Sequence, residues 1–318
     1  MSATIAQGGS GLCGLCFNSD GQLFVASARD SRVLLAEQGQ LLDFSSTGGS
    51  PQGLAIDRSG TVLVADAAHG AVLELGEDGR TRVIFNEFER VRLRVRVGAR
   101  AGARRLRVVV QATPNPSPPS PLLSPTPLTP PLCDCTPQGP HSLVIDSAGA
   151  LYFTDAGPDG DTGLHSPLGS VFVMSQRVLR PIALRCLARP TGIALSPNEA
   201  ALFVAEAAQN RVLRYTQRPP GVWHGTVFFQ FAGRLGPSAL VVDRAREFLY
   251  VARPEALDGA AGRGAASVVA VLSLEGKLLK EFAVPGVGPD VTSMALSPDG
   301  KDLLVAESSS STIVAVTL

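Results

Sequence analysis

The stretch PQGLAIDRSGTVLVADAAHGAVLEL, residues 51–75, decides the fold. It contains three short apolar runs separated by an Asp-x-x-Gly turn and by a few polar residues, which is the pattern of strands that fold back on one another. Variants of this pattern recur over residues 11–36, 140–174, 189–215, 236–272 and 290–316. Six similar units indicate a repeat architecture, in which one supersecondary element is stacked several times.

A fourth apolar segment follows each of the first five units. These segments cover residues 41–44, 82–85, 181–187, 227–231 and 278–284. Four short strands in each unit are typical of a propeller blade. We therefore predict an all-β fold, a six-bladed β-propeller that forms a single domain over residues 1–318.

The sixth unit lacks a fourth strand of its own. Residues 3–6 (ATIA) precede the first unit and could supply that strand. Such a closure would join both ends of the chain in one blade and would cover an otherwise open sheet edge. We expect the ring to close in this way.

Residues 91–136 interrupt the even spacing between the second and third units. The segment opens with the Arg-rich run VRLRVRVGARAGARRLRVVV and continues as the Pro-rich run PNPSPPSPLLSPTPLTPPL. Prolines lack the donor needed inside a sheet, so we expect a disordered low-complexity insertion. The alternative is a functional basic arm with a Pro-rich ligand for a partner domain. We assign no structural role to Cys133 and Cys135, which lie in this segment.

The composition limits the partners. The chain carries 28 Lys and Arg and 28 Asp and Glu, so its formal net charge is zero. A neutral chain has no overall electrostatic attraction to nucleic acid or to an anionic membrane. No apolar stretch reaches the ~20 residues needed to span a bilayer, the N-terminus does not resemble a signal peptide, and the five cysteines are scattered. We expect a cytoplasmic monomer that binds neither nucleic acid nor membrane.

The first strand of each propeller blade starts near the central channel, so equivalent positions at these starts should converge on one mouth. Alignment of the six units by their turns gives these positions as Cys13, Gln52, His141, Thr191, Ser238 and Thr292. A concave polar mouth built from several elements is a common binding site. We predict that these residues bind a small molecule or a protein partner.

Two of the units carry a family resemblance. The segments SLVIDSAGALYFTDAG and RPTGIALSPNEAALFVAEAAQNRVLRY resemble repeats of the gluconolactonase/regucalcin and strictosidine-synthase-like superfamily. Related repeats also occur in non-catalytic propellers. The resemblance implies a divalent metal, often calcium, held in gluconolactonase-like members by one Glu, two Asn and one Asp. The corresponding positions in this sequence are Cys13, His141, Thr191 and Ser238.

None of these four positions keeps a carboxylate. Calcium prefers six to eight oxygen ligands, several of them from carboxylates, so we expect no calcium and no other cofactor. Cys13 and His141 are ligand types that zinc accepts, but the ring offers no obvious third strong ligand. We therefore favour a neutral polar lining over a metal site.

Four acidic residues close the second strands of their units, and they are Asp66, Asp155, Glu206 and Glu307. They could form an acid/base set around the channel, or they could bond turn N–H groups and nearby cations such as Arg211. Repetition over several blades favours the structural role, because catalysis needs a unique geometry.

The loop over residues 155–170 is our candidate lid. Its candidate residues are Asp155, Asp159, Asp161 and His165. The spacing of the acids lacks the pattern of a complete calcium-binding loop. Ser238, His141 and Asp155 include the residue types of a hydrolase triad, but the sequence contains no nucleophile elbow.

Three cysteines allow simple expectations. Cys13 and Cys16 form a CxxC spacing without the context of a redox fold, and residues three apart on a strand should face opposite sides. Cys186 lies in an apolar outer strand, and we expect it in the core.

These observations favour a ligand- or partner-binding propeller with a degenerate metal site. The alternative is a lactone or ester hydrolase with an altered channel site. A third hypothesis is a scaffold that binds its partners through its outer surface.

Overall fold

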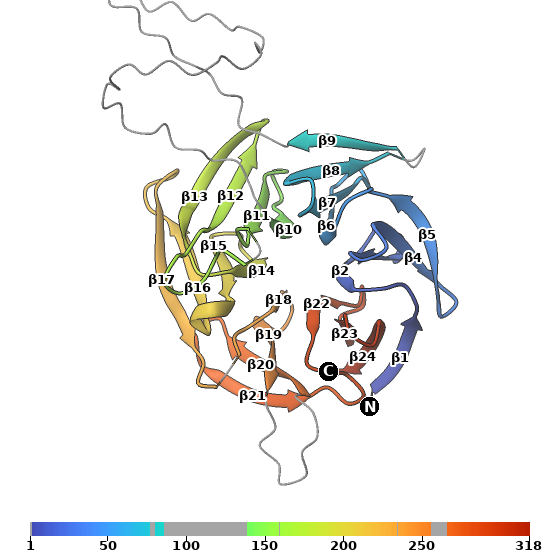
Figure 1. Ribbon diagram of the computed structural model, residues 1–318. Coiled ribbons are helices and arrows are strands. Elements are labelled where there is room, and N and C mark those ends of the chain that lie inside the picture. The colour runs from blue at the N-terminus through green and yellow to red at the C-terminus, as the bar shows by residue number, and fades with distance from the viewer. Residues whose placement is uncertain (1, 77–79, 86–138, 159, 234, 256–265) are drawn as a thin grey trace, which may run out of the picture.

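The computed structural model describes residues 2–76, 80–85, 139–158, 160–233, 235–255 and 266–318. Six four-stranded antiparallel sheets surround a central axis, as Figure 1 shows. The predicted all-β, six-bladed propeller is confirmed. The only helix in the described part of the chain is a single 3-10 turn, Ala207–Gln209, and none there is long and apolar enough to cross a membrane.

The blades follow one another along the chain, and each runs from an inner to an outer strand. Blade 1 contains β2 (Leu12–Phe17), β3 (Leu23–Ser27), β4 (Arg32–Glu37) and β5 (Gln40–Ser46), and blade 2 contains β6 (Pro51–Ile56), β7 (Val62–Asp66), β8 (Ala71–Leu75) and β9 (Thr81–Phe85). Blade 3 contains β10 (Pro140–Ile145), β11 (Leu151–Asp155), β12 (Gly169–Ser175) and β13 (Val178–Leu187), and blade 4 contains β14 (Pro190–Leu195), β15 (Ala201–Glu206), β16 (Arg211–Gln217) and β17 (Trp223–Gln230). Blade 5 contains β18 (Ala239–Asp243), β19 (Phe248–Glu255), β20 (Ala266–Ser273) and β21 (Leu278–Ala283), and blade 6 contains β22 (Val291–Leu296), β23 (Asp302–Glu307), β24 (Thr312–Thr317) and β1 (Ser2–Gln7).

Burial follows the position of a strand within its blade. The second strands are covered on both faces, so every residue of β3, β7 and β11 is buried. Six hydrophobic clusters lie between neighbouring blades and together form the core of the ring. The outer strands face solvent on one side, and β21 is exposed along most of its length. Burial of apolar surface between blades therefore holds the ring together.

The N-terminal strand closes the ring. β1 pairs antiparallel with β24, from Ser2 opposite Val316 to Gln7 opposite Thr312. Ala6 is 2% exposed and packs in the cluster between blades 6 and 1. The two termini consequently lie side by side in Figure 1. The predicted closure by residues 3–6 is confirmed.

The turns between first and second strands need a left-handed residue. Four of these turns use a glycine, and the residues are Gly21, Gly60, Gly149 and Gly300. Blade 4 has Glu199 at the equivalent position, with a φ of 58°. A side chain costs energy in this conformation, so the contacts of Glu199 must offset that cost.

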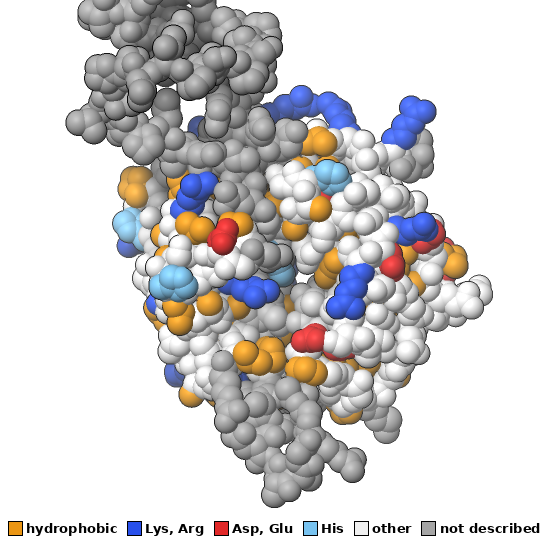
Figure 2. Space-filling model, viewed as in Figure 1, with side chains coloured by type: hydrophobic (Ala, Val, Ile, Leu, Met, Phe, Trp, Pro, Cys, Tyr) orange, Lys and Arg blue, Asp and Glu red, His pale blue; other side chains and the backbone are white. Residues whose placement is uncertain are grey.

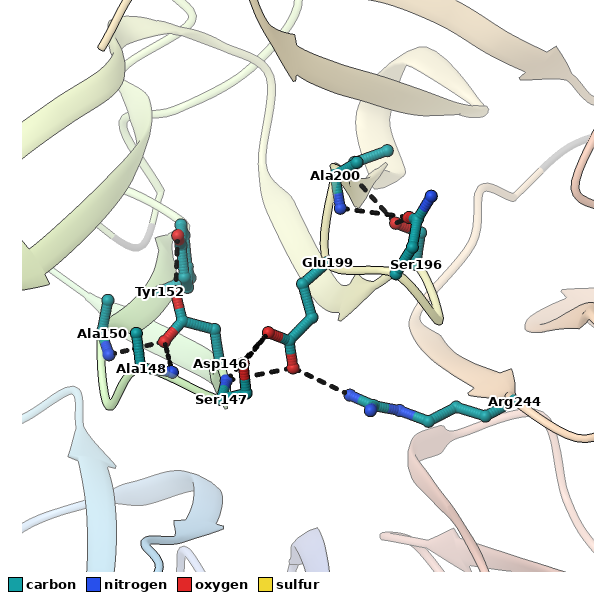
Figure 3. Close-up of polar contacts among 11 residues, drawn as sticks. Asp146, Ser147, Ala148, Ala150, Tyr152, Ser196, Glu199, Ala200 and Arg244 are labelled. Carbon is teal, nitrogen blue, oxygen red and sulfur yellow. Dashed lines mark hydrogen bonds and ion pairs between the residues drawn. The ribbon is translucent and has the colours of Figure 1, made fainter. Parts of the chain in front are cut away.

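Figure 3 shows the contacts of Glu199, which bridge three blades. Its carboxylate accepts hydrogen bonds from the Ser147 amide at 3.0 Å and the Ser147 hydroxyl at 2.5 Å in blade 3. It also lies 3.4 Å from the Arg244 guanidinium in blade 5. The bridge therefore spans the turns of blades 3, 4 and 5 on one face of the ring.

The predicted insertion, residues 91–136, lies outside the described residues. β9 ends at Phe85 and β10 begins at Pro140, so the segment falls in the connection between blades 2 and 3.

Two expectations about cysteines are wrong. Cys13 and Cys16 do not face opposite sides, because both pack in the cluster between blades 1 and 2. The register of β2 against β3 shifts between Cys13 and Leu15, which marks a bulge. The extra residue in this bulge puts the side chains of Cys13 and Cys16 on the same side of the strand. Cys186 is exposed rather than part of the core, since the outer strand β13 presents it to solvent.

Candidate functional site

The inner strands of all six blades enclose a cavity of about 70 Å3 on the axis. Four of the six predicted mouth residues line it: Gln52, His141, Ser238 and Thr292. Ser142 and Ser293 also line it, although the sequence analysis did not single them out. Each inner strand contributes successive residues to the lining, whereas the alignment by turns took one position from each unit and therefore missed these two serines.

Cys13 and Thr191 do not line the cavity. They are 3% and 5% exposed, and each donates a hydrogen bond to a carbonyl of the next blade. The Cys13 thiol lies 2.9 Å from the Pro51 oxygen, and the Thr191 hydroxyl lies 3.1 Å from the Pro237 oxygen. Burial raises the pKa of Cys13 to about 12, so the thiol keeps the proton that it donates. These side chains tie neighbouring inner strands together.

The cavity is narrow because the inner strands approach each other closely. A Cβ on Gly192 would lie 2.7 Å from the Leu240 nitrogen in blade 5, and one on Gly53 would overlap the His141 oxygen in blade 3. A volume of about 70 Å3 holds only a few water molecules, whereas pockets for small organic ligands start at roughly 300 Å3. A larger ligand must therefore bind at the mouth and insert only a small group.

The residues present do not fit the calcium site that the family resemblance implies. Of the four corresponding positions, Cys13 and Thr191 are buried and use their protons on backbone carbonyls. His141 and Ser238 face the cavity, but one imidazole and one hydroxyl are a poor set for a hard cation. Within the described ranges, no group of three or more His, Cys, Asp or Glu side chains could hold a metal ion.

The strand-end acids form structural caps. All four are buried, and each accepts a hydrogen bond from a backbone N–H of a nearby turn or connection: Ser50 and His69 for Asp66, Gly139 and Gly157 for Asp155, Ala188 for Glu206, and Ser310 for Glu307. Glu206 also pairs with Arg211 at 2.7 Å. The structural role favoured by the repetition is the one observed.

The candidate lid residues lie apart from the cavity wall. Asp155 is buried at the end of β11, where it fixes the turn, so it is not a lid residue. Asp161 and His165 are exposed in the connection between β11 and β12, and neither lines the cavity. Asp159 lies outside the described residues.

A carboxylate–imidazole pair stands on blade 2, and the sequence analysis passed over it. Nδ1 of His69 lies 3.1 Å from Oδ1 of Asp66, whose side chain is fully buried, while the His69 side chain is 45% exposed. Asp66 lies opposite Pro51 in the ladder, next to the mouth residue Gln52. The signal in the sequence was the spacing Asp-x-x-His in DAAHG.

Fold and cavity together define a six-bladed propeller with an axial site made by its inner strands. A sequence profile described as SMP-30/Gluconolactonase/LRE-like region matches residues 128–315, more than half of the chain. The chain belongs to this family.

Several known proteins are similar to this chain. The lactonase drp35 of Staphylococcus aureus (strain bovine RF122 / ET3-1) is 34% identical over 116 residues, which are 35% of this chain and 34% of that lactonase. The match thus spans only about a third of that relative's length. A gluconolactonase from Xanthomonas campestris superposes with a TM-score of 0.70 at 18% identity, over 100% of this chain and 89% of that one. Regucalcin from Agrobacterium tumefaciens, described as a calcium-binding protein, gives 0.69 at 15% identity, over 99% and 93%.

Proposed function

We propose that this chain is a ligand-binding member of its family that works without a divalent metal at the channel. The proposed ligand is a small uncharged molecule with hydroxyl, amide or carbonyl groups, bound at the mouth. The observation that supports this proposal is the chemistry of the cavity wall. Among the described residues that line it there is no Asp, Glu, Lys or Arg, and the polar ones are Gln, His, Ser and Thr, which offer hydrogen-bond donors and acceptors.

The surrounding surface supports an uncharged ligand. Figure 2 shows one face of the propeller, on which acidic and basic side chains are scattered rather than gathered into one patch. The cavity wall itself contains no Asp, Glu, Lys or Arg, so a charged group that entered the cavity would be buried without a compensating charge, which is costly. A neutral polar group loses less on entering, because the wall can replace its hydrogen bonds to water.

Calorimetric titration with uncharged polyols and lactones tests this proposal. Gln52→Ala and His141→Ala should each weaken binding about tenfold, since each removes one or more hydrogen bonds to the ligand. Gln40→Ala is the matched control, because Gln40 is exposed on the outer strand β5. Equal losses in the control and the mouth variants would contradict the proposal, as would stoichiometric calcium in the purified protein.

Hydrolysis of a lactone or ester by an altered site is the second candidate function. The observation that favours it is the similarity to the lactonase drp35. Without the family-type metal, such a reaction needs another group to activate water.

A further inference from the structure

We propose that the outer surface of blades 3 and 4 is a docking surface for another protein, and that an extended acidic segment of this partner adds as a further strand to the edge of β17. The surface lies on the rim of the propeller, and the described residues that form it do not line the axial cavity. The proposed site is therefore separate from the binding proposed at the mouth.

The outer halves of blades 3 and 4 carry charge of one sign only. Residues 169–187 and 211–230 cover the third and fourth strands of these blades, and they contain no Asp, Glu or Lys. The same parts of blades 1 and 5, residues 32–46 and 266–283, contain charges of both signs. The six arginines of blades 3 and 4 in these segments are Arg177, Arg180, Arg185, Arg211, Arg214 and Arg218.

Five of these arginines are available to an external partner. Arg211 pairs with Glu206 at 2.7 Å. The other five residues are exposed, and none of them forms an ion pair within the part of the chain that the structure describes. We call these five residues the arginine face: Arg177, Arg180, Arg185, Arg214 and Arg218.

Two arginines of this face have a backbone conformation that suits glycine better. Gln176 and Arg177 form the turn between β12 and β13, with φ values of 51° and 62°. Arg185, within β13, has a φ of 46°. Left-handed backbone costs energy for a residue with a Cβ, and glycine or asparagine usually occupies such a turn. Strained positions of this kind are typical of residues that serve an interaction rather than the fold.

β17 has a long edge without the usual protection. Outer strands normally carry charges or prolines that prevent pairing with another chain. Four of the six outer strands of this ring have such a residue: Asp43 in β5, Arg82 in β9, Pro181 in β13 and Lys280 in β21. β17 and β1 contain none, and β17 is the longer of the two, with eight residues against six. The outer edge of β17 pairs with no other described strand.

The side chains around β17 indicate the sequence of the added segment. Arg214 lies opposite Thr226 in the ladder, and the Arg218 amide donates to the Val222 oxygen at 2.9 Å beside the start of β17. Neighbouring strands lie about 4.8 Å apart, so the Arg214 guanidinium can reach across the short side chain of Thr226 to a carboxylate on an added strand. Val227 points to the opposite face and is 51% exposed. The segment therefore needs acidic residues on one face and apolar residues on the other.

Blade 3 adds positive charge on its side toward blade 4. Arg180 lies opposite Val173, which packs against the cluster between blades 3 and 4. Residues directly opposite each other share one face of a sheet, so Arg180 lies on the face of β13 toward blade 4. Figure 1 shows β13 and β17 as the outer strands of adjacent blades. An acidic segment on β17 is thus attracted by arginines of both blades.

Charge and packing favour a protein segment over two other partners. A second copy of this chain, paired edge to edge along β17, would bring its own Arg214 and Arg218 against those of the first copy, and like charges repel. Single-stranded nucleic acid stacks its bases on aromatic side chains. Trp223 at the start of β17 is already packed edge-on against Tyr152, with ring centroids 6.2 Å apart. The N–H and C=O groups along a strand edge are matched by a peptide backbone.

The test measures, by fluorescence anisotropy, the binding of a labelled ten-residue peptide of alternating Glu and Val to the whole protein. Wild-type protein should bind this peptide, and the affinity should fall as salt is added. Arg214→Glu and Arg218→Glu should each weaken binding at least about tenfold, because a charge-assisted hydrogen bond is replaced by repulsion. The control is Lys280→Glu, which makes the same charge change on the exposed side of β21 and should leave Kd within about twofold.

Backbone-methylated peptides test strand addition without a change in the protein. Alternate residues of a strand direct their N–H groups to the same edge, so methylation of the Glu amides and methylation of the Val amides block opposite edges of the peptide. Antiparallel addition with the Glu side chains over Arg214 uses only one of these edges. One methylation pattern should therefore abolish binding, and the other should leave Kd within about threefold. Equal losses would mean that the peptide binds by charge alone, which would contradict strand addition.

Two results would overturn the inference directly: binding of the Glu–Val peptide no tighter than that of a Lys–Val peptide of equal length, or equal affinities in Arg214→Glu and Lys280→Glu. Tighter binding of single-stranded oligothymidine than of the Glu–Val peptide would contradict the proposed partner and indicate a nucleic acid. Dimers in analytical ultracentrifugation that Val227→Lys abolishes would indicate a second copy instead. Both arginine variants should keep the wild-type Tm, since the two side chains are exposed, and this separates lost binding from lost folding.

Discussion

Glu199 accepts a hydrogen bond from the Ser147 hydroxyl at 2.5 Å, and this contact crosses from blade 4 to blade 3. The hydrogen bonds from Ser147 lower the pKa of the Glu199 carboxyl below its usual value, and Arg244 adds to the effect. Glu199→Gln should therefore lower Tm at pH 7, because a neutral amide is a weaker acceptor. Glu247→Gln is the control, since Glu247 is exposed and has a left-handed backbone in blade 5.

The same bridge predicts a pH dependence. The folded-state pKa of Glu199 lies below its unfolded value near 4.5, so its stabilising effect is complete above that value. The effect is lost as the pH falls through the lower, folded pKa. The Tm difference between wild type and Glu199→Gln should thus be constant from pH 6 to 8 and shrink below about pH 4. A difference that grows toward low pH would contradict this assignment.

Glu307 lacks a contact that Glu206 makes. Oε1 of Glu206 accepts from the Ala188 amide at 2.7 Å, but the corresponding residue in blade 6 is Pro289, which has no N–H. Oε1 of Glu307 is accordingly buried without a hydrogen-bond partner among the described residues.

Shortening the two acids should consequently have opposite effects on stability. Glu206→Asp loses its bond to Ala188 and should lower the free energy of unfolding by about 1–3 kcal/mol. Glu307→Asp should keep or raise it, because an Asp reaches the amide one residue nearer the strand, as Asp66 reaches Ser50. Chemical denaturation of both variants provides the measurement, and a larger loss in Glu307→Asp would contradict the explanation.

The closure by β1 can be tested in two ways. Deletion of residues 1–7 exposes the edge of β24 and should lower Tm by several degrees. Ala6→Asp should do the same with the chain intact, since Ala6 is buried and a charge there has no partner. Ile5→Lys serves as the control, because Ile5 is 40% exposed on the same strand. Equal Tm values for all three and the wild type would show that the ring is stable without this closure.

Residues 91–136 should be dispensable for folding. Their deletion leaves residues 86–90 and 137–139 between β9 and β10, eight residues in all, as many as connect β17 to β18. A long loop adds only a slowly growing closure entropy, so its removal should keep or raise Tm. Limited proteolysis of the full chain should cut this segment first and leave two associated fragments. Failure of the shortened chain to fold would mean that the segment supplies part of a blade.

The blades could be predicted because several independent features of the sequence indicate the same structural unit. In residues 51–75 the apolar runs, the Gly60 turn and the strand-end Asp66 all specify one unit, and repetition removes the ambiguity of a single short pattern. The wall of the cavity was harder to predict. Alternation of side chains does not reveal a bulge, so Cys16 was placed on the wrong side of its strand. The alignment took one position from each unit, so the next residues in two units, Ser142 and Ser293, were missed.

The alignment found equivalent positions but not what their side chains do. Cys13 and Thr191 are equivalent to Gln52 and Ser238, yet only the latter two line the cavity. A small thiol or hydroxyl fits between inner strands and bonds the next blade, which depends on local spacing that no repeat pattern encodes. His69 was passed over because a turn residue in one blade resembles any other polar turn residue. Its partner Asp66 was noticed only as one of four similar acids.

The pairing of β1 with β24 also decides how the molecule would respond to a pull on its two ends. Ser2 lies opposite Val316, so a force applied to the two ends of the chain acts at the same end of the β1–β24 pair. The hydrogen bonds in an antiparallel pair run across the strands. Tension on the two ends would therefore act on these hydrogen bonds one after another instead of on all of them at once. Blade 6 would thus open like a zipper at low force, while the five other blades, whose strands bear no direct tension, would still be folded.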